Sequence, residues 1–269
     1  MRKTTTLLST SFFIFFFFCL SATQVTTSDQ CQLVVKTVDL NNVNKRQVSA
    51  EFLEYLQKYK RGFNIIARDL PIDASHFTVV IERPLFKGGF LGYSYESSIR
   101  SYNVTREEIL ESQKRSGQPE LIIDSLVCAG YLPGEKINYA LFTDNNKIVA
   151  KTSLIPNPLE KMFSDGKAKI QMEYFGGNGS WYAIKFTGFE NEETISFQSI
   201  SGTEEIPEQK FKVLNTVGMH YCNGVIGAEG GKSILTFRRA SGDKVVFVLP
   251  WGYKLIPYLE GKVAFGEIP

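Results

Sequence analysis

The chain has 269 residues, with 30 Lys and Arg against 28 Asp and Glu, and a formal net charge of +2 at pH 7. Arg2 and Lys3 account for that excess, so the remainder of the chain is neutral. A neutral chain has no global field that draws it to nucleic acid or to an anionic membrane. The sequence holds two histidines, which restricts triad-type catalysis to His76 or His220.

The first 22 residues have the pattern of a cleavable export signal. The positive start Met1-Arg2-Lys3 precedes an uncharged apolar segment, residues 7–22. At about 16 residues, this segment falls within the signal-peptide range and is shorter than the ~18–20 residues that span a bilayer. We expect cleavage after Ala22, with Thr23 or Ser28 as alternatives, and an extracytoplasmic chain of about 245 residues in the periplasm, the cell envelope or the medium. An uncleaved signal anchor is the competing interpretation.

Residues 30–118 predict a small α+β domain. A strand is expected at 33–38 and another at 77–86, and the charged segment 106–114 is weakly helical. Ser49 can cap a helix that ends near Gly62. Its apolar positions recur at helical spacing: Phe52, Leu56, Tyr59 and Phe63.

From residue 120 onward the pattern is typical of an all-β structure. Nine short apolar segments alternate with turns that contain Gly, Asn, Asp or Pro, and helix signals almost vanish. We therefore predict a mainly β protein, in which the α+β domain is followed by two tandem immunoglobulin-like β-sandwich modules. Module 1 covers 119–206, and module 2 with the C-terminal tail covers 207–269.

An internal repeat supports the tandem modules. Residues 130–139, GYLPGEKINY, align without gaps with residues 188–197, GFENEETISF. Two predicted hairpins, which begin at Gly166 and Gly231, form a second pair. Residues 130–137 resemble the G-[FY]-x-P-G-E-x-[VI] stretch of bacterial immunoglobulin-like β-sandwich modules, whereas the second copy departs at the turn. The resemblance implies exported modules for adhesion, binding or spacing, and it implies no catalytic residue.

Motifs that would bind a cofactor or a metal fail on inspection. Residues 227–233 resemble a phosphate-binding loop, but Ile226 occupies the position that requires Gly, and a strand follows instead of a helix. No C-x-x-C pair supports a metal site. We therefore expect no cofactor and no metal.

The candidate reactive residues are His220 and Cys222. Spacing of two on a strand places both side chains on one face, where they could form a nucleophile pair. Ser75 precedes His76, but neighbours on a strand point to opposite faces.

Three cysteines remain after signal cleavage, and two of Cys31, Cys128 and Cys222 can form a disulfide in any of three pairings. Two sequons, at Asn103 and Asn178, accept glycan if the host glycosylates exported proteins.

A binding role is the function that these features favour. Trp181, Tyr182 and Trp251 are candidates for an aromatic contact surface. We expect an exported, non-enzymatic protein for binding, adhesion or scaffolding, with a protein or glycan partner and no nucleic acid. The alternatives are a secreted hydrolase that uses His220 and Cys222 or a site in the N-terminal domain, and a periplasmic chaperone-like assembly factor that accepts a partner strand.

Overall fold

A computed structural model describes residues 31–40, 61–83, 99–116, 120–176, 180–214 and 218–263. The expected signal peptide and most of the expected helix from Ser49 lie outside these residues. Among the described residues, no helix has both the length and the apolar character needed to span a membrane.

The first group of strands forms a β-sandwich. One antiparallel sheet has the order β1 (Gln32–Asp39), β2 (Arg61–Arg68), β5 (Leu121–Val127). The other has the order β4 (Ile99–Thr105), β3 (His76–Glu82), β6 (Ile137–Thr143), β7 (Ile148–Leu154). Helix α2 (Arg106–Ser116) connects β4 to β5. Alternating side chains of both sheets meet in one core, which includes Ile65, Phe77, Val79, Ile109 and Leu141.

The second group of strands forms another sandwich. Its first sheet has the order β13 (Met219–Cys222), β10 (Trp181–Thr187), β9 (Lys169–Gly176), β8 (Leu159–Met162). Its second sheet has the order β12 (Glu204–Lys212), β11 (Thr194–Ser201), β14 (Gly230–Arg239), β15 (Lys244–Gly252). The 3₁₀ helix η4 (Tyr253–Leu255) and helix α3 (Ile256–Leu259) pack Leu255, Tyr258 and Leu259 onto this core.

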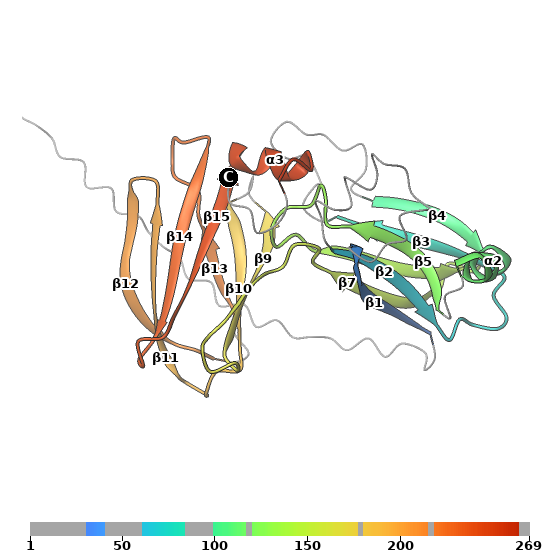
Figure 1. Cartoon of the computed structure of the whole chain (residues 1–269), viewed down its shortest axis with the longest axis horizontal. Coiled ribbons are helices and arrows are strands. Elements are labelled where there is room, and N and C mark those ends of the chain that lie inside the picture. Colours follow the sequence, from blue (N-terminus) through green and yellow to red (C-terminus); the bar gives the residue numbers. More distant parts are fainter. Residues whose placement is uncertain are drawn as a thin grey trace, which may run out of the picture.

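The two sandwiches share one topology. Strands β1 to β7 and strands β9 to β15 occupy corresponding places in chain order, and β8 is an added edge strand beside β9. Figure 1 shows the two groups of strands next to each other, with α3 near the space between them. The molecule is therefore a mainly β protein built of two related sandwiches.

This pairing corrects the predicted domain organisation. The N-terminal strands do not make a separate α+β domain, because β2 pairs with β5 and β3 pairs with β6 across the expected boundary at 118/119. The boundary at 206/207 likewise falls inside strand β12. Arg61, Gly62 and Phe63, which were expected to end a helix, begin strand β2. The predicted helix at 106–114 is confirmed as α2.

Candidate functional site

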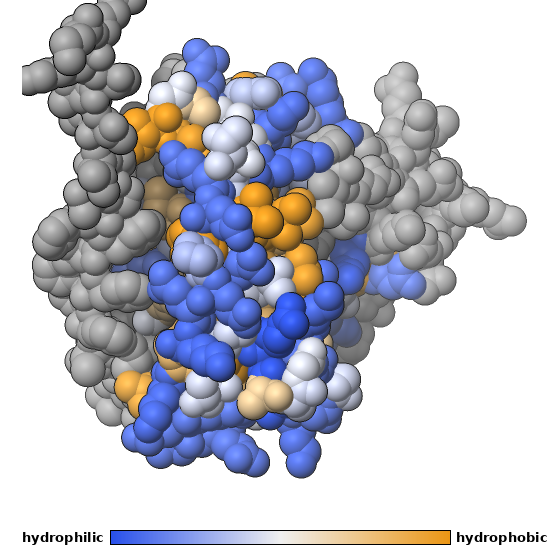
Figure 2. Space-filling view, turned by 90° about the vertical axis from the view of Figure 1, so that its left-hand side faces the viewer, coloured by the Kyte–Doolittle hydropathy of each residue, from blue (hydrophilic) through white to orange (hydrophobic). Residues whose placement is uncertain are grey.

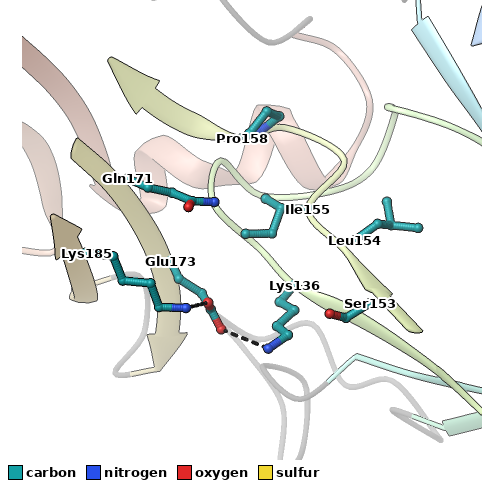
Figure 3. A pocket seen from close by; sticks show the side chains of 8 residues that line it. All are labelled: Lys136, Ser153, Leu154, Ile155, Pro158, Gln171, Glu173 and Lys185. Carbon is teal, nitrogen blue, oxygen red and sulfur yellow. Dashed lines mark hydrogen bonds and ion pairs between the residues drawn. The ribbon is translucent and has the colours of Figure 1, made fainter. Parts of the chain in front are cut away.

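A polar groove lies where the two sandwiches meet. It has a volume of about 340 Å³ and is lined by Lys136, Ser153, Leu154, Ile155, Pro158, Gln171, Glu173 and Lys185. Figure 3 shows Lys136 and Lys185 on opposite sides of Glu173. The Nζ atom of Lys185 lies 2.7 Å from one carboxylate oxygen, and that of Lys136 lies 3.6 Å from the other. The Lys136–Glu173 pair therefore links the two sandwiches across the groove, whereas Lys185 and Glu173 lie on neighbouring strands of the second sandwich.

The loop between β5 and β6 fixes this joint. Leu132 has no exposed surface and belongs to the core of the second sandwich, although it is part of the first. The Gly134 N–H donates to the Asn157 carbonyl at 2.8 Å, and the Gly134 carbonyl accepts from the Tyr174 N–H at 2.9 Å. Gly134 has a φ of 79°, and a Cβ there would lie 3.0 Å from the Met172 carbonyl oxygen. A side chain at this position would force the two backbones apart.

A buried ion pair holds the same loop in place. Glu135 is fully buried and accepts two hydrogen bonds from the Arg83 guanidinium, at 2.6 and 2.8 Å, and one from the Leu132 N–H at 2.9 Å. The guanidinium also lies 4.6 Å from the ring centre of Tyr131. Burial raises the pKa of the Glu135 carboxyl, while Arg83 and the Leu132 N–H act in the opposite direction. The two parallel hydrogen bonds between the Arg83 guanidinium and the Glu135 carboxylate fix the conformation of the loop.

The second copy of the sequence repeat builds the same kind of turn. Glu193 accepts from Arg239 at 2.5 and 3.0 Å and from the Glu190 N–H at 3.2 Å. Arg239 lies 5.8 Å from the ring centre of Phe189, and Gly188, like Gly130, has a φ of 74°. The Gly, aromatic and Glu positions of the alignment thus have matching roles in both copies.

The repeat does not, however, mark corresponding strands of two modules. The first copy leads into β6 and the second into β11, which hold different places in their sandwiches. The second predicted pair matches the β9–β10 hairpin with the β14–β15 hairpin, which also differ in place. The likeness therefore lies in a local turn, while the duplication of the sandwich is visible only in the strand topology.

An aromatic patch lies on the outer face of β9, β10 and β13. We define it by Phe175, Trp181 and His220, whose rings neighbour one another. Phe175 and Trp181 are 47% and 42% exposed. The Phe175 ring centre lies 6.2 Å from that of Trp181 and 4.8 Å from that of His220. Glu173 precedes Phe175 by two residues on β9, so the patch and the polar groove share one face of the sheet.

Only one of the three predicted contact residues belongs to this patch. Trp181 is exposed, whereas Tyr182 is 0% exposed and Trp251 is 3% exposed. Strand alternation explains the difference between the neighbours Trp181 and Tyr182, because one points outward and the other into the core. Phe175 was missed by the prediction, although the alternation along β9 was a signal for it.

His220 and Cys222 lie as expected on one face of β13. Cys222 pairs with Trp181 and His220 pairs with Ala183 in the neighbouring strand. No hydrogen bond joins the imidazole to the thiol in this described part of the chain, and the ring contact of His220 is with Phe175. The arrangement places a histidine in an aromatic contact instead of against a nucleophile.

Ser75, His76 and Asp144 form a second cluster of catalytic residue types. Ser75 precedes β3, so strand alternation does not separate it from His76, and its hydroxyl lies 2.8 Å from Nδ1. Asp144 Oδ2 lies 3.8 Å from the same Nδ1, and Asp144 Oδ1 accepts from the His76 N–H at 3.1 Å. A triad needs serine and carboxylate on different imidazole nitrogens. The side chains of His76 and Asp144 are both well exposed. The cluster is therefore a set of surface contacts and not a triad.

The described cysteines are all free thiols. Cys31 adjoins the Gln32–Arg68 pair and Cys128 adjoins the Val127–Gly62 pair, at opposite ends of β2. That places them roughly 20 Å apart, far beyond the ~7 Å Cα separation of a disulfide. Cys222 lies in the other sandwich. Among the described residues, no group of three His, Cys, Asp or Glu could hold a metal ion.

The segment 227–233, which resembles a phosphate-binding loop in sequence, is followed by a strand, as predicted. Gly230, Gly231, Lys232 and Ser233 begin β14 and pair with β15. The Ser233 hydroxyl is buried and donates to Ser201 at 2.7 Å. A phosphate-binding loop would open a helix, so this segment belongs to the sheet.

Comparisons with known proteins find a distant structural resemblance and no sequence family. No family model matches the chain, and no curated protein matches it. A two-domain fibronectin type-III segment of chicken tenascin is 10% identical, covering 70% of this chain and 91% of that one, with a TM-score of 0.21. The chicken CNTN1 FN1–FN3 domains are 10% identical over 71% of this chain and 60% of that one, with a TM-score of 0.22.

A bacterial protein structure resembles this chain to a similarly small degree. Tp47, the 47-kilodalton lipoprotein of Treponema pallidum, is 10% identical, with 81% of this chain and 50% of that one covered and a TM-score of 0.20. All three resemblances are distant, and the fold described above rests on the strand pairing itself.

Proposed function

We propose that this is an exported, non-enzymatic binding protein, which contacts its partner through the aromatic patch and the adjoining polar groove. The exposed cluster of Phe175, Trp181 and His220 carries the proposal. Interfaces combine an aromatic centre with a polar rim, and Trp is enriched among the residues that dominate binding energy. Glu173 and Lys185 supply the rim on the same sheet face.

The ring geometry favours a protein partner over a glycan. The Phe175 ring is inclined by 59° to Trp181 and by 40° to His220. Inclined rings leave a notched surface that suits an apolar side chain, whereas a sugar ring stacks best on a flat one. The ion pairs of Glu173 with two lysines offer both signs of charge to a matching surface.

The fixed joint supports a scaffolding aspect of the same role. Leu132 and Gly134 connect the sandwiches through core packing and backbone hydrogen bonds, and the buried Arg83–Glu135 ion pair holds the loop that carries them. A bound partner would therefore be held at a defined orientation to the first sandwich.

A cell-binding assay tests the proposal. Fluorescently labelled secreted chain is titrated onto intact cells and extracellular material of the source organism. We expect saturable binding that Trp181→Ala weakens by at least about 30-fold, the equivalent of a 2 kcal/mol hot spot. Protease treatment of the cells should abolish the binding, and glycan oxidation by periodate should leave it.

The matched control removes exposed apolar surface from the opposite sheet. Ile200 and Ile234 pair on β11 and β14 and are 41% and 43% exposed. Figure 2 shows that end of the molecule as largely hydrophilic, with small hydrophobic areas. If Ile200→Ala with Ile234→Ala weakens binding as much as Trp181→Ala does, the patch is not the contact surface. Binding that survives protease and is lost with periodate would assign a glycan partner instead.

A further inference from the structure

We infer that Asn103 on strand β4 is an N-glycosylation site, and that the glycan covers a sheet edge with which no strand of the described residues pairs. The inference rests on the proposed export, because the lipid-linked oligosaccharide donor is met only along a secretory route. Asn103, Val104 and Thr105 form an acceptor sequon.

The side chain of Asn103 is placed to carry a glycan. Val104 packs against the core of the first sandwich, so its neighbour Asn103 points outward and is exposed. The Thr78 hydroxyl donates to Asn103 Oδ1 at 2.8 Å. Within the described residues no hydrogen bond uses Nδ2, the atom that a glycan occupies. The fold therefore holds the amide by its oxygen and leaves its nitrogen toward solvent.

Strand β4 lies at the end of its sheet, in the order β4-β3-β6-β7. Among the described residues, no strand pairs with its outer side. An open edge invites pairing with another chain unless charges, proline or a cover protect it. Strand β4 has seven residues and one charged side chain, Arg100. The large side chains of Ile99 and Tyr102 on this strand are 49% and 37% exposed.

The corresponding strand of the second sandwich is protected in a different way. Strand β12 has the sequence EEIPEQKFK, with five charged residues and Pro207 in its centre. Both strands end their sheets at the same place in the topology. The sandwich whose edge strand has a single charge and no proline is the one whose edge strand carries a sequon. A glycan at Asn103 would supply the missing protection.

The modification breaks an N–H and a C–O bond and forms one N–C bond, and the released proton passes to the solvent. Nδ2 of Asn103 bonds to the anomeric carbon of the oligosaccharide and loses a proton. The bond from that carbon to the lipid diphosphate breaks, and the lipid diphosphate leaves. The host transferase of the secretory route catalyses the step.

The test uses the full chain expressed with its own leader in a secretory eukaryotic host. Secreted protein is treated with peptide N-glycanase and mapped by peptide mass. We expect a glycan on Asn103 in the Asn178→Gln variant, which keeps a single sequon, and loss of that glycan in Asn103→Gln. Thr105→Ser, which retains a sequon, is the matched control and should remain glycosylated.

Two failures are distinguishable. Retention of the chain inside the cell with its own leader would overturn the proposed export. If a host leader in place of residues 1–22 then yields secreted protein with unmodified Asn103, the glycosylation inference is overturned as well.

The covering role has its own readout. The secreted Asn103→Gln chain should associate with rising concentration in light scattering, whereas Thr105→Ser should stay monomeric. An added Ser101→Lys charge on the bare edge should restore the monomer. Equal association of Asn103→Gln and Thr105→Ser would contradict the covering role.

Discussion

Removal of Leu132 is expected to uncouple the two sandwiches. The side chain comes from the β5–β6 loop of the first sandwich and is completely buried in the core of the second. Leu→Ala at a buried site costs about 2–5 kcal/mol, the transfer free energy plus a cavity. For a chain of this size, that corresponds to a fall in Tm of roughly 4–20 °C. Part of the loss falls on the contact between the sandwiches, so we expect calorimetry to show one transition for the wild type and two for Leu132→Ala.

The control for this experiment is a leucine buried within one sandwich. Leu235 on β14 is also 0% exposed and belongs to the same core, but it does not cross the joint. Leu235→Ala should lower the stability of the second sandwich and leave the orientation of the two sandwiches unchanged in small-angle scattering. Leu132→Ala should broaden that orientation. Identical scattering of Leu132→Ala and wild type would refute the role of Leu132 as the coupling residue.

Two further predictions concern titratable groups. Burial raises the pKa of Cys128 to about 11 from an ordinary value of 9.0, so its thiolate at pH 8 is about a hundredfold scarcer than that of a free thiol. Iodoacetamide should therefore modify the partly exposed Cys222 well before Cys128, and the opposite order in peptide mapping would contradict the structure. As the pH rises, the Cys128 thiol loses its proton at a lower pH in the unfolded state than in the folded state. The free energy of unfolding should therefore fall between pH 9 and 11, and Cys128→Ala should reduce that fall. Hydrogen bonds from the Lys167 and Ala168 N–H groups and from Arg239 hold the pKa of Asp165 at about 2, against 3.8 ordinarily. The stability it contributes is present above pH 3.8 and lost as the pH falls through 2, and Asp165→Asn should abolish that dependence in acid unfolding curves.

The turn at 130–137 shows which parts of a tertiary contact the sequence pattern predicted and which parts it did not. The alignment with 188–197 identified Gly130 and Glu135 as members of a repeated turn, and both copies share the Glu–Arg fork. The arginine partners had no sequence signal: Arg83 directly follows β3, and Arg239 ends β14. Strand pairing brings them to the carboxylates, so the partner of each Glu is a tertiary fact.

Local chemistry alone determined the mainly β character, the position of most strands from residue 120 onward and the helix at 106–116, because alternation and turn residues act over a few positions. It also made Trp181 a candidate contact residue, together with Tyr182 and Trp251. Tertiary structure decided which strands belong together, since β2 pairs with β5 across more than fifty residues. It decided as well that Trp251 is buried, that Phe175 completes the aromatic patch, and that the first copy of the repeated turn forms the joint between the two sandwiches. Pairing and burial depend on residues distant in the chain, and no local pattern contains them.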